Sequence, residues 1–311
     1  MMFKNSLKLF VANFSVFWKL LLYKIIAIGV CVLLLIPVIP AWESALSQVS
    51  FVEQLTNFAT NTVFSSTAVF LRSLFILVDT FVSAVGILFA SSAISVFYSA
   101  FVVLFLLPIL FGLSSIPTGE GLYSYMASLS KSSFTATFIS KIGSSFVYSI
   151  LRTLIVIPVV AIICVCLYFL LSLSLLDGIL QVFLPIIVIL FFVISVSVLI
   201  TILCGWLPAT VVFNAKPIKG FKKGLKAVFR KFFRLLSSVL VIIFFTTMLS
   251  FMFTTFSLIA LIPLASVSII MLEMVMFFES QGMRYYVDLD TIVTPKKLEQ
   301  CDKFNKVKNI I

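Results

Sequence analysis

Long apolar runs alternate with short polar or basic segments along almost the whole chain. A helix that crosses the hydrocarbon core of a bilayer needs about 20 predominantly apolar residues. Runs of this length predict six spanning helices, at residues 20–41, 87–113, 150–176, 184–207, 236–258 and 263–280. The predicted fold class is therefore an all-α, polytopic transmembrane helix bundle. Residues 1–280 form a single transmembrane domain in this interpretation, and residues 281–311 form a polar tail.

The stretch between the first two predicted spans is less regular. Residues 43–66 are polar, but apolar side chains recur at helical spacing, which predicts a helix lying in the outer interface: Trp42, Leu46, Val49, Val52 and Leu55. Residues 67–86 are apolar, yet they include Arg72 and Asp79. This segment is either a second interfacial helix or the first half of a long tilted helix, and the sequence leaves both open.

Proline, glycine and aspartate mark the expected turns. Pro117, Gly119 and Gly121 predict a turn within residues 114–121, and Asp177-Gly178 separates two strongly apolar runs. The stretch from 235 to 278 is too long for one span and long enough for two. Pro263 is the residue at which we expect this stretch to turn back.

Composition supports a lipid environment and removes several kinds of chemistry. Hydrophobic residues make up 62% of the 311 residues and charged residues 11%, far outside the range of soluble domains. Histidine is absent, which excludes histidine bases, histidine metal ligands and Ser–His or Cys–His triads. Four of the five cysteines lie in apolar runs, where cysteine behaves as a small hydrophobe. We expect no enzymatic activity, no cofactor and no metal.

One acidic motif superficially resembles a catalytic one. Asp288-Leu289-Asp290-Thr291 follows a short β-prone run, as in the first motif of haloacid-dehalogenase-type phosphatases. Only 21 residues follow Asp290, too few to supply the remaining catalytic groups. The sequence therefore argues against that activity.

The net charge of +11 is distributed very unevenly. Of 22 lysines and arginines, 21 lie in residues 4–24, 131–152, 216–234 and 284–308, and Arg72 is the exception. The positive-inside rule then predicts that both termini are cytoplasmic in a plasma-membrane protein. The basic charge is expected to meet lipid headgroups, not nucleic acid.

Two similar segments precede predicted spans. Residues 17–21 read Phe-Trp-Lys-Leu-Leu and residues 232–236 read Phe-Phe-Arg-Leu-Leu, with a weaker copy at 148–154. They indicate a threefold repeat of an amphipathic helix followed by a helical hairpin. Any basic, aromatic entry into a membrane has a similar composition, so this alternative stays open.

The layout resembles the uncharacterised bacterial six-helix membrane proteins of the UPF0259 and DUF975 groups. The resemblance rests on the overall arrangement, the basic entry helix from Lys219 to Arg234, and Arg284-Tyr285-Tyr286 before the tail. It extends loosely over most of the chain and implies a fold without implying an activity.

The basic segment is the first candidate site. Its cations step by three or four residues and share one helical face, beginning just after Pro217 at a first-turn position: Lys219, Lys223, Lys226, Arg230 and Arg234, with Lys222 beside them. Aromatic and aliphatic residues occupy another face, which suits a helix on the inner leaflet. The segment is either a topology anchor or a surface for anionic lipid or a protein partner.

Glu273 is the second candidate. It follows Pro263 by ten residues, about 15 Å at helical rise, which places it near mid-bilayer if the helix begins there. Ionisable groups at that depth are costly and typically functional. The alternatives are a neutral hydrogen-bonded acid and a helix shifted so that Glu273 approaches the surface.

These features predict a multi-pass protein with a structural, regulatory or assembly role. Its basic cytoplasmic face would engage anionic inner-leaflet lipids or a membrane or cytoplasmic protein partner. The alternative function is a small-solute or lipid transporter that uses Glu273.

Overall fold

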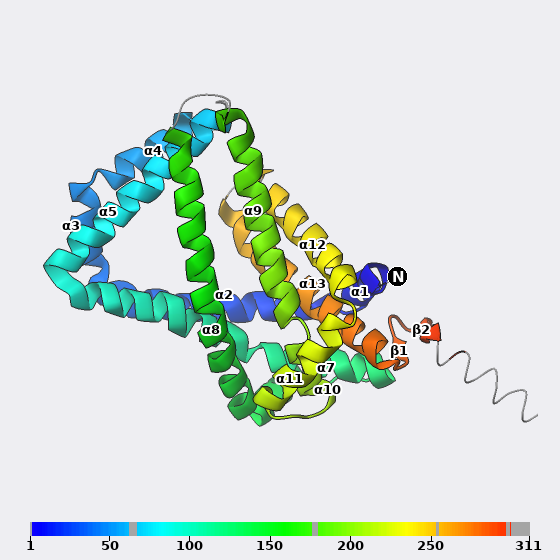
Figure 1. Cartoon of the computed structure of the whole chain (residues 1–311). Helices are drawn as coiled ribbons and strands as arrows, with labels where there is room; N and C mark the ends of the chain where they lie inside the picture. Colours follow the sequence, from blue (N-terminus) through cyan, green and yellow to red (C-terminus); the bar gives the residue numbers. More distant parts are fainter. Residues whose placement is uncertain (1, 62–66, 176–179, 253–254, 297–298, 300–311) are drawn as a thin grey trace, which may run out of the picture. The chain divides into compact units, whose positions relative to one another are not determined.

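A computed structural model describes residues 2–61, 67–175, 180–252, 255–296 and 299. Helices dominate, which confirms the all-α prediction (Figure 1). Five described helical stretches are long and apolar enough to cross a membrane: Ser15–Gln48, Val69–Ser128, Phe134–Ser172, Phe183–Val212 and Pro263–Gln281. Phe232–Thr247 is apolar but shorter. The six crossings and their direction stay predictions.

The chain divides into two compact units. The first unit contains residues 1–26, 109–152 and 196–311, and the second contains residues 27–108 and 153–195. Helices α2 (Ser15–Leu35), α8 (Phe134–Ser172) and α9 (Leu180–Leu203) contribute to both.

In the second unit, η1 (Ile36–Val38), α3 (Ile39–Gln48) and α4 (Phe51–Asn61) lead into α5 (Thr67–Ala100). The helix predicted within residues 43–66 is confirmed for residues 43–61, although the left-handed Ser50 (φ 50°) interrupts it, and residues 62–66 lie outside the described residues. Its place in the outer interface stays a prediction. Residues 67–86 belong to the first half of a long helix, because α5 continues through them. Helix α5 contacts α3 and α4 and bends at Ser92, where the backbone leaves helical geometry (Figure 1).

The remaining helices of the second unit are also apolar. A π-helical segment (Phe101–Leu106) and the first residues of α6 (Leu107–Leu113) extend α5, and α6 continues in the first unit from residue 109. A 3-10 turn, η3 (Leu173–Leu175), ends α8, and the predicted break at Asp177-Gly178 lies outside the described residues. One buried cluster joins residues of α5, α8 and α9: Leu71, Phe75, Leu171, Leu184 and Val188. Beside it, the Tyr168 hydroxyl donates to Asp79 at 2.8 Å, so Asp79 is paired within the helices.

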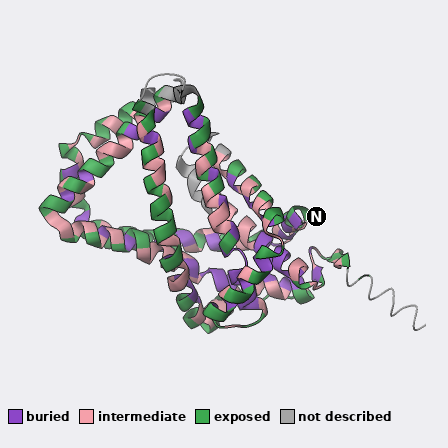
Figure 2. Cartoon of the chain, in the orientation of Figure 1, coloured by how far each residue is buried: buried purple, intermediate pink, exposed green. Residues whose placement is uncertain are grey.

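The first unit has a more densely packed base. Its elements are α1 (Met2–Ala12), α7 (Ser115–Ser128), α10 (Trp206–Val212), α11 (Pro217–Phe229) and the second half of α13 (Thr255–Gln281). Figure 2 shows buried residues gathered on these elements. Helix α12 (Phe232–Met252) precedes α13 and contacts it. Every residue from 271 to 278 is buried, so this apolar segment is covered by protein.

Two predicted turns are wrong. Residues 115–128 form helix α7, because Pro117 lies in the first turn, where the missing N–H needs no helical partner. The chain turns after this helix, at the left-handed Leu129 (φ 57°). Pro263 lies inside α13, and the described helices instead end at Met252 and begin again at Thr255.

A short antiparallel hairpin follows α13. Strand β1 (Tyr285–Tyr286) pairs with β2 (Ile292–Val293), as the β-prone run indicated. Asp288 and Asp290 form its turn, in which the Asp290 N–H donates to the Asp288 carboxylate at 3.1 Å. A hydrogen bond from Thr291 lowers the pKa of Asp288, and Lys8 lies 3.5 Å from this carboxylate. The motif therefore serves a local turn contact with α1.

Candidate functional site

Helix α11 carries the basic face that the sequence predicts. It begins at Pro217, as expected from first-turn proline, and contains no acidic residue. All six predicted surface cations are exposed: Lys219, Lys222, Lys223, Lys226, Arg230 and Arg234. The single helix expected from Lys219 to Arg234 is wrong, however, because α11 ends at Phe229, Arg230 follows its end, and Arg234 belongs to the next helix, α12. The sequence alone thus located this face, because a regular helical period separates its charged and small residues.

The opposite face of α11 packs closely against α10. Gly220 lies against Thr210, and Gly224 lies against Gly205, with no room for a side chain at either glycine. The Trp206 indole N–H donates to the Pro217 carbonyl at 2.8 Å. These contacts fix the helix by its small residues, so its cations are held on an outward face.

The apolar face of α11 is only partly free for lipid. Val228 is fully buried, and the Phe221 ring packs 4.7 Å from that of Trp206. Ile218 and Phe229 stay exposed, at 62% and 67%. Helix α10 therefore covers part of this apolar face.

A pocket lies at the junction of α10, α11 and the end of α13. We call it the basic pocket; it has a volume of about 200 Å³ and is lined by Phe213, Lys223, Lys226, Ala227, Arg230 and Gln281. Three lining side chains are cationic and none is acidic. The spacing of Lys223, Lys226 and Arg230 predicted a common face, but Phe213 and Gln281 join them only through the tertiary fold.

Glu273 is buried in the first unit, at 5% exposure. The Cys204 thiol, at the junction of α9 and α10, donates a hydrogen bond to its carboxylate. Arg152 interacts electrostatically with the same carboxylate and donates to the buried Tyr148 hydroxyl. Among the described residues the ion pairs are Lys8–Asp288, Lys141–Glu120 and Lys231–Glu279, so Arg152 acts on Glu273 over a longer distance.

The structure gives the position of Glu273 along its helix. Helix α13 starts at Thr255, so Glu273 is 18 residues from its beginning and eight from its end at Gln281. Eight residues correspond to about 12 Å of helix. Protein surrounds Glu273 at this position, and its depth in a bilayer stays a prediction.

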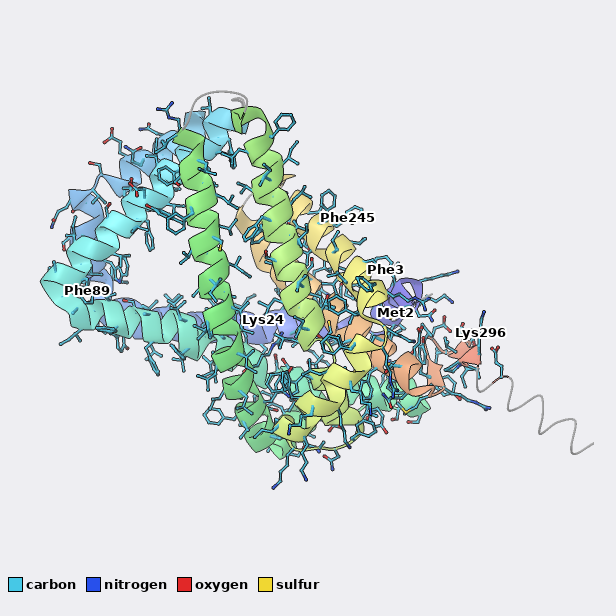
Figure 3. All side chains as sticks on the ribbon, viewed as in Figure 1. Met2, Phe3, Lys24, Phe89, Phe245 and Lys296 are labelled. Atoms are coloured by element: carbon cyan, nitrogen blue, oxygen red, sulfur yellow. The ribbon has the colours of Figure 1, made fainter. Side chains whose placement is uncertain are left out.

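A second cation, Lys24, belongs to this buried region. It lies on α2 (Figure 3), is only 7% exposed, and donates to the Ser266 hydroxyl at 2.7 Å. Its ammonium also lies 5.4 Å from the centre of the Phe111 ring and is close enough to Arg152 for mutual repulsion. We call Lys24, Tyr148, Arg152, Cys204 and Glu273 the buried charged cluster.

Three buried hydroxyl groups on α8 and α9 have no hydrogen-bond partner among the described residues. Within the described part of the chain, Ser145, Ser197 and Thr201 are buried and their hydroxyls find no hydrogen-bond partner. Ser197 and Thr201 precede Cys204 by seven and three residues, which places all three on one side of the chain as it leaves α9. Buried hydroxyls without partners are uncommon and call for a water, an ion or a ligand.

Sequence reasoning found Glu273 but missed its neighbours. Lys24 and Arg152 counted only as charges that fix the orientation in the membrane, and Cys204 counted as a small hydrophobe. The positions of Lys24 and Arg152 in the sequence could have revealed them, because they already fall inside the predicted spans 20–41 and 150–176. An ionisable residue inside a span calls for a partner.

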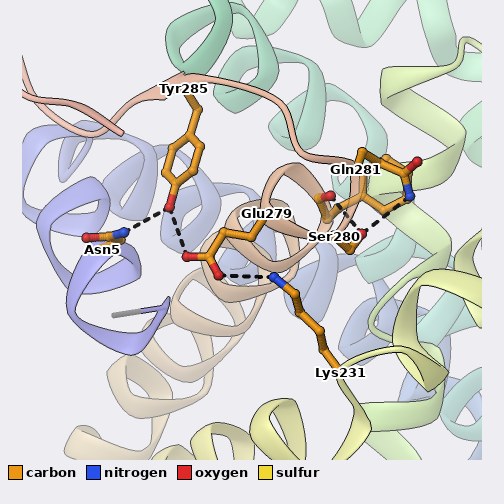
Figure 4. Close-up of polar contacts among 7 residues, drawn as sticks. Asn5, Lys231, Glu279, Ser280, Gln281 and Tyr285 are labelled. Carbon is orange, nitrogen blue, oxygen red and sulfur yellow. Dashed lines mark hydrogen bonds and ion pairs between the residues drawn. The ribbon is translucent and has the colours of Figure 1, made fainter. Parts of the chain in front are cut away.

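A separate polar network joins the end of α13 to other elements of the base (Figure 4). The Tyr285 hydroxyl accepts from Asn5 at 2.8 Å and donates to Glu279 at 3.2 Å. Lys231, between α11 and α12, forms an ion pair with Glu279 at 3.2 Å. Burial raises the pKa of Tyr285, and the Glu279 charge adds to that effect. This network holds α1, α13 and the start of α12 together.

No protein family model, no curated protein and no solved structure matches this chain. The resemblance to the six-helix bacterial groups stays a prediction for this reason. The basic face and the buried charged cluster are therefore the features that bear on function.

Proposed function

We propose that this protein is a non-enzymatic, multi-pass component of the plasma membrane with a structural, regulatory or assembly role. Its termini and α11 would lie on the cytoplasmic side. There the basic face would engage anionic lipid or an acidic protein partner. The observation that carries the proposal is that α11 packs closely on α10 while the six predicted cations, on this helix and just after it, are all exposed.

Physical arguments support a membrane surface as the counterpart of this helix. A lysine or arginine near an anionic leaflet contributes about 1 kcal/mol. The segment 216–234 holds eight such residues, and no acidic residue occurs from 178 to 272. Charge repulsion within such a segment favours an acidic counterpart over free solvent.

The test replaces Lys219, Lys223, Lys226 and Arg230 by glutamine in the full-length protein. We expect the variant to lose correct membrane localisation or its place in a larger complex, measured by fractionation and by crosslinking in intact membranes. A variant with four exposed polar changes elsewhere, Ser44, Gln48, Thr56 and Asn57 to alanine, provides the control. Unchanged localisation and unchanged crosslinks in the lysine and arginine variant would reject the proposal.

A second candidate function is transport of a small solute or lipid with Glu273 as the coupling carboxylate. It is favoured by the buried charged cluster and by the unsatisfied hydroxyls of Ser197 and Thr201. Charges placed within apolar helices commonly mark ion or substrate paths. A carboxylate that interacts with Arg152 could change its charge or its partner during such a cycle.

Flux in proteoliposomes tests this candidate. Glu273→Gln should abolish a pH- or cation-dependent flux while expression and folding remain normal. Glu43→Gln, a change to an exposed carboxylate, serves as the matched control and should leave the flux intact. Wild-type flux in Glu273→Gln would remove this carboxylate from the mechanism.

A further inference from the structure

The basic pocket concentrates positive charge in a defined volume. Lys223, Lys226 and Arg230 line it, and so does Gln281, whose amide nitrogen donates one hydrogen bond to Ser280 and has a second N–H. The Lys223 ammonium lies 4.3 Å from the centre of the Phe213 ring, which also lines the pocket. An anion that enters would meet three cations and an N–H donor together, which a flat basic surface does not offer.

These three cations have no acidic partner within the described structure. The ion pairs there use Lys8, Lys141 and Lys231. Glu279 is the carboxylate next to Gln281 in sequence, but Lys231 and Tyr285 already occupy its two oxygens. The pocket therefore keeps a net positive charge that an external anion can neutralise.

The floor of the pocket is rigid. Ala227 is buried against Ala209 and Phe277 in one apolar cluster. The Phe213 ring packs on that of Phe277 at 5.6 Å. Since the floor and the cations belong to packed elements, little ordering is needed when a ligand binds.

Exposed apolar side chains occur on the elements around this pocket. Phe213 is 42% exposed, Phe229 67% and Phe233 84%. A basic helix with exposed aromatics is suited to the boundary between lipid headgroups and acyl chains. A ligand that combines an anionic group with acyl chains matches both features.

We propose that the basic pocket is a binding site for the phosphate-containing headgroup of an anionic phospholipid. Lys223, Lys226 and Arg230 bind the phosphate, Gln281 donates a hydrogen bond, and the acyl chains lie along Phe229 and Phe233. The proposal rests on the basic face of the proposed function and names its ligand class and its site. It differs from diffuse attraction to a charged surface because only the cations that line the pocket should matter.

The experiment measures lipid binding by native mass spectrometry of the full-length protein in a neutral detergent. The probes are dioctanoyl phosphatidylglycerol, dioctanoyl phosphatidylcholine and inorganic phosphate. We expect phosphatidylglycerol to bind at least tenfold more tightly than phosphatidylcholine, and inorganic phosphate to compete only weakly. Equal binding of the two lipids would overturn the proposal, and so would full competition by inorganic phosphate at equal concentration, which would indicate a free-phosphate site.

Two triple variants with equal charge then separate the pocket from the general surface. The pocket variant carries Lys223→Gln, Lys226→Gln and Arg230→Gln, and we expect about a hundredfold weaker binding of phosphatidylglycerol. The control variant carries Lys216→Gln, Lys219→Gln and Lys222→Gln, which are equally exposed on or beside α11 but do not line the pocket. It should stay within about threefold of wild type.

The outcomes distinguish this proposal from the proposed function. Equal loss in both triple variants would reject the pocket and leave a diffuse basic surface, as the proposed function requires. Selective loss in the pocket variant combined with normal localisation of the fourfold variant would support the pocket and reject the proposed role. Thermal unfolding of each variant in the same detergent should match wild type, because all six side chains are exposed.

Discussion

Helix α8 and the second half of α13 are both apolar, yet the protein covers them to very different extents. The most apolar window of Phe134–Ser172 has a mean hydropathy of 3.2 and only 6% of its residues are buried in the protein. For Pro263–Gln281 the mean hydropathy is 1.5 and 61% are buried. The less apolar helix is therefore the one that protein covers, and α8 depends on lipid to cover its side chains.

This difference separates two ways of holding helices together. In the base of the first unit, close glycine contacts and the hydrogen bond from the Trp206 indole N–H to the Pro217 carbonyl hold α10 and α11 together. In the second unit, a small cluster of large apolar side chains joins α5, α8 and α9. We expect substitutions in these two regions to differ in size and in mechanism.

The largest effect is expected where two helices meet through glycine. Gly224→Leu would place a side chain into the backbone at Gly205 and should destabilise the protein by about 4 kcal/mol or more, since backbone cannot yield as a side chain can. Thermal unfolding in detergent measures this. Gly143→Leu is the control, because space is free there and its unfolding temperature should not fall. A stable Gly224→Leu protein would contradict close packing of α10 and α11.

A smaller but substantial effect is expected in the apolar cluster of the second unit. Leu184 is 2% exposed, and Leu184→Ala should cost about 3 kcal/mol through lost burial and a cavity. Leu190 lies on the same helix at 51% exposure, and Leu190→Ala should cost under about 1 kcal/mol. Chemical denaturation in mixed micelles compares the free energies of unfolding of the two variants. Equal losses would show that α9 does not pack with Leu184 buried and Leu190 exposed.

Trp206→Phe tests a single buried hydrogen bond in the base. It removes the donor to the Pro217 carbonyl while keeping most of the ring, and should cost about 2 kcal/mol. Trp18→Phe, at a tryptophan that is 59% exposed, should have almost no effect on thermal unfolding. If both variants unfold at the same temperature as wild type, the bond does not stabilise the α10–α11 contact.

The smallest effect concerns Tyr285 and pH. Because burial raises the pKa of Tyr285 above its ordinary value of 10.0, the folded protein holds this proton more tightly than the unfolded chain. Stability from this group is therefore complete below about pH 10 and is lost as pH rises above it. Tyr285→Phe should cost about 1 kcal/mol at neutral pH and should flatten the alkaline decline. Tyr286→Phe should keep the wild-type pH profile of thermal unfolding.

The fold class and the basic helix were open to prediction because both depend on local periodicity. Long apolar runs gave the helices, and the step of three or four residues from Lys219 to Arg230 gave the face of α11. Turns were harder. Pro117 and Pro263 fall within helices, because proline is tolerated in a first turn and within apolar helices whose neighbours compensate for the lost bond.

The candidate sites show the same division between local pattern and tertiary contact. Glu273 was identified because one carboxylate in an apolar run is conspicuous in a sequence. Its association with Cys204 and Arg152 could not be identified from the sequence, because these residues lie 69 and 121 positions away. Likewise, three cations of the basic pocket share a helical face, but Phe213 and Gln281 come from other elements.

The sequence by itself determined that this chain forms apolar helices suited to a membrane, and that its positive charge gathers in four segments. Hydropathy and helical period are properties of neighbouring residues, so no tertiary information is needed. Only the tertiary structure decided which apolar helix is covered by protein, which charges are buried together and where a pocket forms. Those outcomes depend on close contacts between distant segments, such as Gly205 with Gly224, and no local pattern encodes their pairing.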